Sequence, residues 1–574
     1  MKKEVRAIKK FYSLIWPRFS KRGIILFIML LFAAAILLPF PFLTQYLVDG
    51  VIANPDKIFA IKALFIIGGC LLGLQIFDAF YQYILGKIRV RLNNDISIHL
   101  RMLITKKLQK IKQIFFRKTD RGTVFHRYVN DVQDSQTVLF EGVTYAIIDI
   151  ARVIFGIIAL FILSPIMAVI VLIILPFYVL ALKKTSKKIV EGQERLIKKR
   201  SLMYGFFLEF IRSITLVKAY VLNLFSNKRM EKRMQDYAES VFKFEKVRIV
   251  VEQVVGLIGA LGPLIILIYG GYQIIIGNFT LGALMAFTQF VPYVFGSAST
   301  LVDFTVELER AYPPIHNILN LLRFNEEIQK PGSFKPIKNN SISFENVDYK
   351  IKNKQILKNV SFKIDENKII SIVGKSGSGK SSIFKMIEGF WYPNSGKVLV
   401  GNEDTTKTDI RKIRGSIGYV SQDSIMLKDT IYNNISLGKN IPLSDIKKYS
   451  KIVQMDSIIQ KLPKKYDSVI DPEETNFSGG QLQRLSLVRA LAQNKKILLL
   501  DEFSSEIDPA TERRILKAIK EFKGKKTILI IAHDKSCVTY SDKILVIDNG
   551  RLVEQGNYRE LSSKRSSFFN KVFS

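Results

Sequence analysis

The sequence predicts a multidomain chain: an all-α polytopic membrane domain of six transmembrane helices, followed by an α/β domain built around a phosphate-binding loop. Two observations predict this division. Long apolar runs are confined to the first half of the chain, whereas short strand-like and helix-like segments alternate after about residue 340. In that second half, a glycine-rich stretch, GKSGSGKS at 374–381, follows an apolar strand and precedes a helix.

Composition narrows the class of protein. The chain has 574 residues and a net charge of +35, which fits either a nucleic-acid-binding protein or a membrane protein with basic cytoplasmic connections. The distribution of the charge favours the membrane protein, so we expect no nucleic-acid partner. The two cysteines, Cys70 and Cys537, fall in different halves and indicate neither a disulfide framework nor a zinc site.

Six apolar runs in the first half are each long enough to cross a bilayer, which takes roughly 20 helical residues. The connections between them alternate between short and long, and the long ones span about 86–141 and 183–250. The predicted spans are 24–48, 59–85, 143–163, 166–182, 251–276 and 281–302.

Basic residues are distributed unevenly over these connections. The N-terminal segment and both long connections are dense in Lys and Arg, whereas the short connections are almost free of cations, with Lys57 the exception. The positive-inside rule then places the N-terminus, the long connections and the second half of the chain in the cytoplasm. We therefore expect a multi-pass protein of the cell membrane, with the lipid bilayer as a partner.

Some of the predicted spans contain ionisable residues. Asp78 lies in the second span, and Asp149 and Arg152 lie in the third. Charges at this depth are costly, so this part of the third span should face protein or water rather than lipid. The i,i+3 spacing of Asp149 and Arg152 allows mutual neutralisation on one helix face, and a contact with a transported substrate is the alternative.

The glycine-rich stretch has the spacing GxxxxGK[ST] of a phosphate-binding loop. Gly374, Gly377 and Gly379 allow the backbone to curl around phosphates, Lys380 can reach the β- and γ-phosphates, and the Ser381 hydroxyl can ligate Mg²⁺.

A second apolar strand, KKILLLDE, supplies two carboxylates further along the chain. Asp501 at the strand end is placed to hold Mg²⁺, directly or through water. Glu502 next to it is a natural general base for an attacking water, although position alone also allows a solvated loop carboxylate.

A third feature is NFSGGQLQR at 476–484, where a Ser and two Gly precede a helix. The N-terminus of a helix presents N–H groups and partial positive charge, so this stretch also predicts an anion site. The chain therefore has two candidate phosphate-binding sites, more than one hundred residues apart.

The order of these motifs resembles the ATP-binding cassette (ABC) exporters, specifically a half-transporter with its membrane domain before its nucleotide-binding domain. YVSQD resembles the Q-loop with Gln422, FSGGQ the signature motif, LLLDE the Walker B strand, SSEID the D-loop ending in Asp508, and IIAHD the switch loop with His533. FFRKTDRGTVFHRYVNDV and EFIRSITLVKAY resemble the two cytoplasmic loops of exporters, and GNFTLGALMAF the turn between the last two spans. We accordingly expect a transmembrane domain at 1–318, a linker at 319–340 and an ABC-type ATPase domain at 341–574.

The resemblance implies that ATP and Mg²⁺ bind between two chains, either two copies of this chain or this chain and a related half-transporter. The phosphate loop of one chain faces the signature motif of the other, which explains why one chain has two candidate phosphate-binding sites. The implied catalytic residues are Glu502, His533 and Gln422, and the implied Mg²⁺ ligands are Ser381, Gln422 and Asp501. The implied ATP-binding residues are Gly374, Lys375, Ser376, Gly377, Ser378, Gly379, Lys380, Ser381, Ser382, Tyr349, Ser478, Gly479, Gly480, Gln481 and Asp508.

The function that the resemblance implies is ATP-driven export of a drug, lipid or peptide by alternating access, with coupling helices near 119–127 and 211–222. An importer on the same fold, or a regulatory half of a heterodimer, is the alternative. The sequence leaves the unidentified substrate open.

The sequence departs from the family pattern at two places near the site. Ile351 stands where exporters usually place an adenine-stacking aromatic, and Tyr349, on the same strand face, either takes over that role or is an ordinary packing residue. The segment DPEETN before the signature lacks the usual text, so Glu473 or Glu474 is expected to contact the opposite membrane half.

Overall fold

The computed structural model describes residues 2–330, 332, 334–351, 354–471, 477–532, 534–564 and 567–573. Its contacts divide the chain into two compact units. The first consists of Met1–Leu108 and Arg121–Phe324, and the second of Gln109–Asp120 and Asn325–Ser574. The inclusion of Gln109–Asp120 in the second unit was not predicted from the sequence.

The first unit is all-α. Six of its helical segments are long and apolar enough to cross a membrane, among the residues that the structure describes, so the predicted all-α polytopic fold is confirmed. The helices are α1 (Lys2–Ala35), α2 (Pro39–Tyr46), α3 (Lys57–Lys110), α5 (Arg121–His126), α6 (Val132–Gln136), α7 (Val143–Leu163), α8 (Pro165–Arg212), α9 (Ile214–Ala219), α10 (Asn223–Ile275) and α11 (Leu281–Arg323), with π-helical turns η1 (Leu47–Ile52), η2 (Arg127–Asp131) and η3 (Thr137–Gly142).

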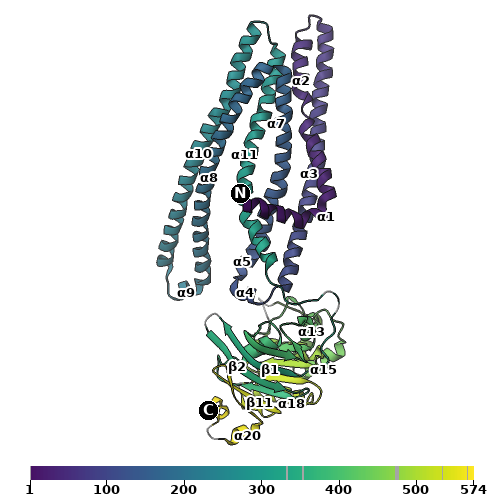
Figure 1. Ribbon diagram of the computed structural model, residues 1–574, viewed down its shortest axis with the longest axis vertical. Helices are drawn as coiled ribbons and strands as arrows, with labels where there is room; N and C mark the ends of the chain where they lie inside the picture. Colours follow the sequence, from purple (N-terminus) through teal and green to yellow (C-terminus); the bar gives the residue numbers. More distant parts are fainter. Residues whose placement is uncertain are drawn as a thin grey trace. The chain divides into compact units, whose positions relative to one another are not determined.

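The long connections between spans are mostly helical extensions of the spans themselves. Helix α3 continues to Lys110, and α8 and α10 run side by side as a hairpin closed by the short helix α9 (Figure 1). Their Lys-, Arg- and Glu-rich sequences are good helix formers, so the helices continue past the apolar runs.

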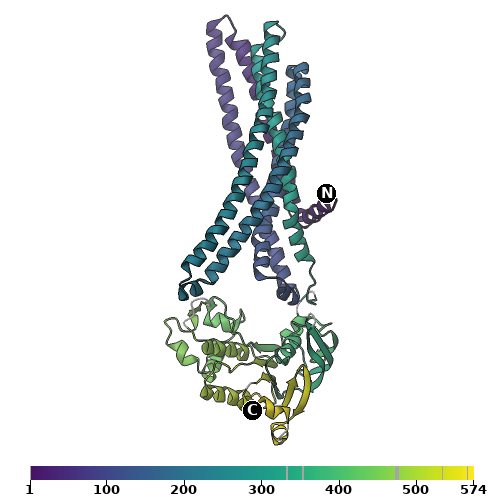
Figure 2. The same cartoon turned by 90° about the vertical axis from the view of Figure 1, so that its left-hand side faces the viewer.

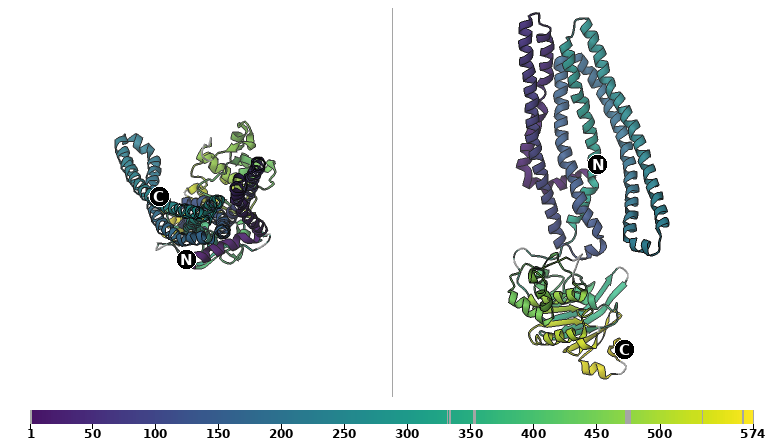
Figure 3. Two further views of the ribbon diagram at one scale, coloured as in Figure 1. Left: turned by 90° about the horizontal axis from the view of Figure 1, so that it is seen from above. Right: turned by 180° about the vertical axis from the view of Figure 1, so that it is seen from behind.

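The first helix changes direction within its length. Figure 3 shows the start of α1 lying across the other helices before the chain turns along them, and Figure 2 shows this start projecting to one side of the first unit. Pro17 lies inside α1, and a proline within a helix removes a backbone hydrogen bond and favours a bend. The first predicted span is also interrupted, because α1 ends at Ala35 and α2 begins at Pro39.

The core of the first unit lies where α7, α8, α10 and α11 meet. Phe287, Phe290 and Val294 of α11 are completely buried there. Asp149 of α7 is buried too, its carboxylate lies 3.8 Å from the Arg152 guanidinium, and it accepts a hydrogen bond from the Thr300 hydroxyl. The neutralising ion pair expected from their spacing is therefore present.

The second unit is an α/β domain with two main sheets. The larger sheet has the strand order β12-β11-β3-β10-β9-β6, in which all neighbours are parallel except β12, and the smaller antiparallel sheet has the order β2-β1-β4-β5. The strands are β1 (Ile342–Ile351), β2 (Lys354–Ile364), β3 (Ile369–Val373), β4 (Ser395–Val400), β5 (Glu403–Asp404), β6 (Ile417–Val420), β7 (Asp429–Thr430), β8 (Val469–Ile470), β9 (Ile497–Asp501), β10 (Thr527–Ile531), β11 (Lys543–Asp548) and β12 (Arg551–Gly556).

The helices of the second unit are α4 (Ile114–Lys118), α12 (Lys380–Ile387), α13 (Ile410–Arg414), α14 (Ile431–Ser436), α15 (Leu443–Ile452), α16 (Asp456–Gln460), the 3₁₀ turn η4 (Lys465–Asp467), α17 (Gly479–Ala492), α18 (Pro509–Lys520), α19 (Lys535–Val538), α20 (Tyr558–Ser563) and α21 (Phe568–Val572). Strands β3, β9 and β10 are buried on both faces, as their predominantly apolar sequences indicate. In such sheets ligands bind at the carboxyl ends of the parallel strands.

Candidate functional site

The phosphate loop connects the end of β3 to α12. Gly374 has a φ of +155°, and a Cβ built there would lie 2.1 Å from the carbonyl oxygen of Ile547, so only glycine fits. A Cβ built on Gly377 would meet nothing within 4 Å, which leaves that side of the loop open. A cavity of about 340 Å³ lies against the loop, lined by Lys375, Ser376, Gly377, Ser378, Asp548, Asn549, Phe568, Lys571 and Val572.

Lys380 lies beneath this loop. Its Nζ donates to the carbonyl oxygens of Gly374 at 2.8 Å and Lys375 at 3.1 Å, and the side chain is buried. Burial lowers the pKa of Lys380, and the nearby carboxylates of Glu502 and Asp501 oppose that shift. A buried cation whose hydrogen bonds, among the described residues, go to neutral carbonyls has a strong electrostatic preference for a phosphate anion.

Serine hydroxyls complete the loop. The Ser378 hydroxyl is buried and has no hydrogen-bond partner among the described residues. Ser381, in the first turn of α12, is exposed, whereas Ser382 is buried. The Ser381 hydroxyl is thus accessible to a cation held beside the loop.

Asp501 ends β9 and is 3% exposed. One of its carboxylate oxygens has no partner among the described residues, and the other accepts from the Tyr419 hydroxyl at 3.4 Å. Burial and then the neighbouring Glu502 raise the pKa of Asp501. An unpaired buried carboxylate oxygen is costly, and a cation would offset that cost.

These residues fit Mg²⁺. The described residues contain no cluster of three or more His, Cys, Asp or Glu side chains that would form a closed metal site. Mg²⁺ is ordinarily held by one or two carboxylates together with substrate phosphates and water, which matches one buried carboxylate and an accessible hydroxyl. Asp501 and Ser381 are the residues that would hold it, and Gln422 as a third ligand stays a prediction.

Glu502 and Gln422 meet at the ends of neighbouring strands. In the register of β6 and β9, Val420 pairs with Leu500, so the residues two positions further along also lie together. The Gln422 amide Nε2 donates to the Glu502 carboxylate at 2.9 Å. Glu502 has a φ of +49°, an uncommon conformation for a residue with a side chain and one that often accompanies functional positions.

A buried glutamine that sequence reasoning missed holds the turn after Asp501. Gln483, on α17, donates to the carbonyl oxygen of Glu502 at 2.9 Å and to the Ser505 hydroxyl at 3.2 Å, and it accepts from the Glu506 N–H at 3.3 Å. The only signal in the sequence is a glutamine on a buried helix face, in the stretch LQRLSLV.

The signature stretch forms the N-terminus of α17. Ser478 is its N-cap, and its hydroxyl accepts from the Gln481 N–H at 3.3 Å while the Gln481 side chain accepts from the Ser478 N–H at 3.0 Å. This reciprocal capping box fixes the first turn, whose N–H groups face the helix end. Gly479 and Gly480 lie so close to Glu506 that an added Cβ would meet it at 1.8 Å and 2.2 Å, respectively.

Asp508 caps the next helix, α18. Its carboxylate accepts from the Thr511 N–H at 2.9 Å, and the hydrogen bonds from Thr511 lower the pKa of Asp508. The side chain is exposed. The structure therefore gives Asp508 a structural role within its own chain, and its expected contact with ATP stays a prediction.

A buried group that the sequence did not single out lies behind Asp501. Glu388 is 5% exposed, and burial raises its pKa to about 7. The Lys385 ammonium donates to Tyr419, whose hydroxyl in turn contacts Asp501. Lys385 and Tyr419 thus form a chain of hydrogen bonds that ends at one carboxylate oxygen of Asp501.

Tyr349 does not present a free ring face. It is 7% exposed, its ring stacks on Trp391 with centroids 5.3 Å apart, and its hydroxyl accepts from Arg117 at 3.4 Å. The Arg117 guanidinium also lies 4.6 Å from the centre of the Trp391 ring. Adenine stacking by Tyr349 stays a prediction, and this geometry favours the packing alternative.

Arg117 belongs to a segment that packs within the second unit. Lys112 lies 4.9 Å from the centre of the Tyr392 ring, and Ile111 forms a β-bridge with Glu326. The helices nearest to the two predicted coupling segments are α4 with α5, and α9. His533, Glu473 and Glu474 lie outside the described residues, so their predicted roles stay predictions.

Comparison with known proteins shows which protein families the two halves of the chain match. Residues 24–298 match the family described as ABC transporter transmembrane region, and residues 357–505 match the family described as ABC transporter. Relatives in several strains of Staphylococcus aureus, including NCTC 8325 and COL, are 27% identical over 538 residues, which is 92% of this chain and 93% of theirs. Their names describe candidate multidrug export ATP-binding/permease proteins.

A solved structure has the same fold along nearly the whole chain. The structure of a bacterial Atm1-family ABC exporter with ATP bound superposes with a TM-score of 0.84 and covers 97% of this chain and 98% of that one, at 22% sequence identity.

Proposed function

Because the chain belongs to the ABC transporter family, as an exporter-type half-transporter whose ATPase is coupled to transport, we propose that it exports a drug, lipid or peptide across the cytoplasmic membrane. Alternating access of the membrane domain to the two sides is the proposed mechanism. The N-terminus and the nucleotide-binding domain are proposed to be cytoplasmic, since basic residues are concentrated in the N-terminal segment and the long connections.

The observation that carries this proposal is the hydrogen bond between Gln422 and Glu502. It places a carboxylate at the strand end that also bears Asp501, whose charge acts on the phosphate-loop residue Lys380. One chain thus holds a phosphate-binding lysine, a buried carboxylate for a cation and a candidate base. A regulatory half that has lost catalysis would not need all three.

Each side chain has a distinct task in hydrolysis. Lys380 exchanges its carbonyl partners for the β- and γ-phosphate oxygens, and Gln422 orients the Glu502 carboxylate through its amide. Glu502 accepts the proton of the water that attacks the γ-phosphorus, a contribution of typically ~10²–10⁴-fold. When bound, Mg²⁺ supplies charge neutralisation at the phosphates. His533 is proposed to hold the γ-phosphate.

The signature turn completes the site from a second molecule. We assign Ser478, Gly479 and Gly480 to the ATP held by another chain, either a second copy or a related half-transporter. Support comes from the capping box, which preorganises the first turn of α17 as an anion site. The cavity at the phosphate loop is lined, among the described residues, by none of these three.

The test is substitution of the base in the reconstituted full-length protein. Glu502→Gln should retain ATP binding and lower the turnover rate by about 100-fold or more, because it removes the proton acceptor without changing shape. Lys380→Ala should instead weaken ATP binding. The matched control is Glu366→Gln, an exposed carboxylate on a turn, which should keep the wild-type rate.

Turnover and export are measured on the same preparation. A Glu502→Gln protein that hydrolyses ATP at the wild-type rate would contradict the assignment of the base. Inside-out vesicles should accumulate substrate when ATP is added outside. Accumulation only in right-side-out vesicles that contain ATP would instead indicate import.

A further inference from the structure

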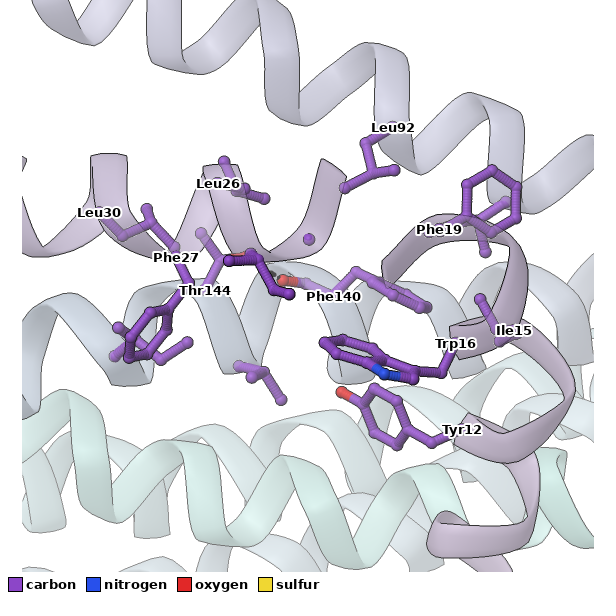
Figure 4. Close-up of a pocket in the computed structure, with 15 residues that line it drawn as sticks. Tyr12, Ile15, Trp16, Phe19, Leu26, Phe27, Leu30, Leu92, Phe140 and Thr144 are labelled. Atoms are coloured by element: carbon purple, nitrogen blue, oxygen red, sulfur yellow. Dashed lines mark hydrogen bonds between the residues drawn. The ribbon is translucent and has the colours of Figure 1, made fainter. Parts of the chain in front are cut away.

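An apolar cavity of about 360 Å³ lies inside the bend of α1, a size within the range of ligand sites. Figure 4 shows Tyr12 and Trp16 on one arm of the bent helix and Leu26 and Leu30 on the other, with Phe140 and Leu92 contributed by other segments. The lining residues are Tyr12, Ile15, Trp16, Phe19, Gly23, Ile24, Leu26, Phe27, Leu30, Leu92, Ile96, Phe140, Val143, Thr144 and Ile147. These residues come from α1, α3, η3 and α7.

The rim of this cavity exposes large apolar side chains. Trp16 is 50% exposed, Ile24 51% and Phe27 45%, although each also lines the cavity. An apolar hollow with an apolar rim is stable only against an apolar neighbour, and for a helix at a membrane that neighbour is a hydrocarbon chain.

A second cavity adjoins the first and has the opposite character. Both are lined by Phe19, and the second, of about 460 Å³, is also lined by Arg18, Arg22, Asp95, Ile98, His99, Met102, Leu103 and Lys106. Arg22 is paired with Asp95 at 2.7 Å, and an Arg18 Nη1 lies 3.4 Å from the ring nitrogen Nδ1 of His99. Three cations and one carboxylate leave this cavity with a net charge of +2.

We propose that the two adjoining cavities bind one anionic phospholipid of the membrane. Its acyl chain occupies the cavity beside Trp16. Its phosphate is bound by Arg18 and Lys106, because the third cation of the second cavity, Arg22, is paired with Asp95. Charge complementarity selects an anionic headgroup, because a zwitterionic one gains no net attraction from the excess of positive charge.

The sequence of the first arm of α1 agrees with this occupant. Residues 1–23 contain eight Lys and Arg and one Glu, interleaved with Phe, Tyr, Trp and Ile. A basic helix with an aromatic face is typical of a segment that lies in the plane of a membrane surface. The proposal adds a bound lipid to the transporter and does not depend on which substrate it exports.

The chain carries a suitable reporter. It has two tryptophans, Trp16 and Trp391, so in a Trp391→Phe background the fluorescence comes from Trp16 alone. The full-length protein is reconstituted in phosphatidylcholine vesicles that contain increasing fractions of either brominated phosphatidylglycerol or brominated phosphatidylcholine, since bromine quenches tryptophan on contact. We expect the anionic lipid to quench Trp16 at a clearly lower mole fraction than the neutral one.

Charge variants test the headgroup contacts. Arg18→Gln and Lys106→Gln should each reduce the preference for the anionic lipid about fivefold, as expected for one basic residue near an anionic headgroup. The matched control replaces two exposed cations of α10, Lys232→Gln with Arg233→Gln, and should keep the full preference.

A variant with a larger side chain tests the acyl-chain cavity independently. A Cβ added to Gly23 would lie 3.4 Å from the Trp16 ring, so Gly23→Leu fills the cavity and should reduce quenching by the anionic lipid. Gly73→Leu is the control, because a Cβ on that glycine of α3 meets nothing within 4 Å. Native mass spectrometry of the detergent-purified protein gives a second readout, in which the wild type and the control retain phosphatidylglycerol and the Gly23→Leu variant does not.

The proposal is overturned if both brominated lipids quench Trp16 equally, or if the two charge variants keep the wild-type preference. It is also overturned if ATP turnover depletes the anionic lipid from the site, because the lipid would then be a transported cargo. Quenching that is the same with and without ATP is the expected result. A loss of ATPase activity alone would bear on the proposed export function and not on this site.

Discussion

Tyr349 illustrates how neighbouring residues fix the position of a single side chain. It belongs to a buried apolar cluster of the second unit, its ring stacks on Trp391, and its hydroxyl accepts from Arg117. Burial raises the pKa of Tyr349 further above its ordinary value. A residue whose ring is buried and whose hydroxyl is also bonded contributes to stability first.

We therefore expect Tyr349→Ala to destabilise the protein and to leave the KM for ATP unchanged. Loss of a buried aromatic ring costs about 3–5 kcal/mol. Tyr349→Phe, which removes only the hydroxyl, should cost about 1 kcal/mol. The measurements are the thermal unfolding midpoint and the ATPase KM of the purified full-length variants.

The opposite result would restore the stacking role. If Tyr349→Ala unfolds at the wild-type temperature and its KM rises with little change in kcat, the ring contributes uniform binding energy to the nucleotide. Adenine stacking would then be the correct interpretation.

The residues of the candidate site differ in how much of their position and contacts could be predicted from the sequence. The pairing of Gln422 with Glu502 follows from two motifs at the ends of neighbouring parallel strands, and the resemblance named both residues. Gln483 was missed because its three contacts are with backbone groups and a hydroxyl of a turn nineteen or more residues away, which spacing within one helix does not reveal. The partner of Tyr349 was missed for the same reason, since Trp391 lies on a different connection.

At the scale of elements, α17 and the turn from Glu502 to Asp508 form one rigid piece. Gln483 bonds to three groups of the turn, and the turn packs on the two glycines of the signature. The contacts differ in kind: Gly479 faces the carboxylate of Glu506, whereas Gly480 faces its backbone carbonyl. The flexible carboxylate can move aside, but the carbonyl cannot move without the chain.

This difference predicts unequal effects of adding one methyl group. Gly480→Ala should lower the free energy of unfolding by about 1–3 kcal/mol and displace the turn that carries the base, so the ATPase rate should fall with it. Gly479→Ala should cost less. In a Glu506→Ala background, the remaining cost of Gly479→Ala should disappear and that of Gly480→Ala should persist.

The unfolding midpoint and the ATPase rate of the six proteins of this cycle provide the measurement. Equal rescue of both alanine variants by Glu506→Ala would show that the backbone contact at Gly480 is not limiting.

The elements themselves were largely predictable, and the exceptions have physical causes. Apolar length placed α7 at the residues predicted for the third span, and short, mainly apolar runs identified β3 and β9. Two features were not anticipated. The first predicted span is interrupted because Pro39 and Pro41 follow Leu38, and Gln109–Asp120 packs in the second unit through cation–π contacts made by Lys112 and Arg117. Such contacts between distant residues leave no periodic trace in the sequence.

At the scale of the whole molecule, the chain carries two anion-binding turns that begin at Gly374 and Ser478. Both lie in the second unit, and each is preorganised locally, the first by a buried lysine and the second by a capping box. If each serves a different ATP, the functional unit contains two chains, and one intact site draws on both of them. That arrangement makes a definite prediction for a dimer assembled from two different variants.

One protomer carries Lys380→Ala and the other Ser478→Arg, whose bulk would obstruct the close N–H contacts of the helix end. With sharing between chains, one site of the mixed dimer contains both lesions and the other contains neither, so the mixed dimer should occlude one nucleotide. Each homodimer has two damaged sites and should occlude none. If each signature instead served its own chain, both sites of the mixed dimer would be damaged and no nucleotide would be trapped. Purified mixed dimers, with pairing verified by two different affinity tags, separate these outcomes, because the same two lesions are present in both cases and only their distribution between the sites differs.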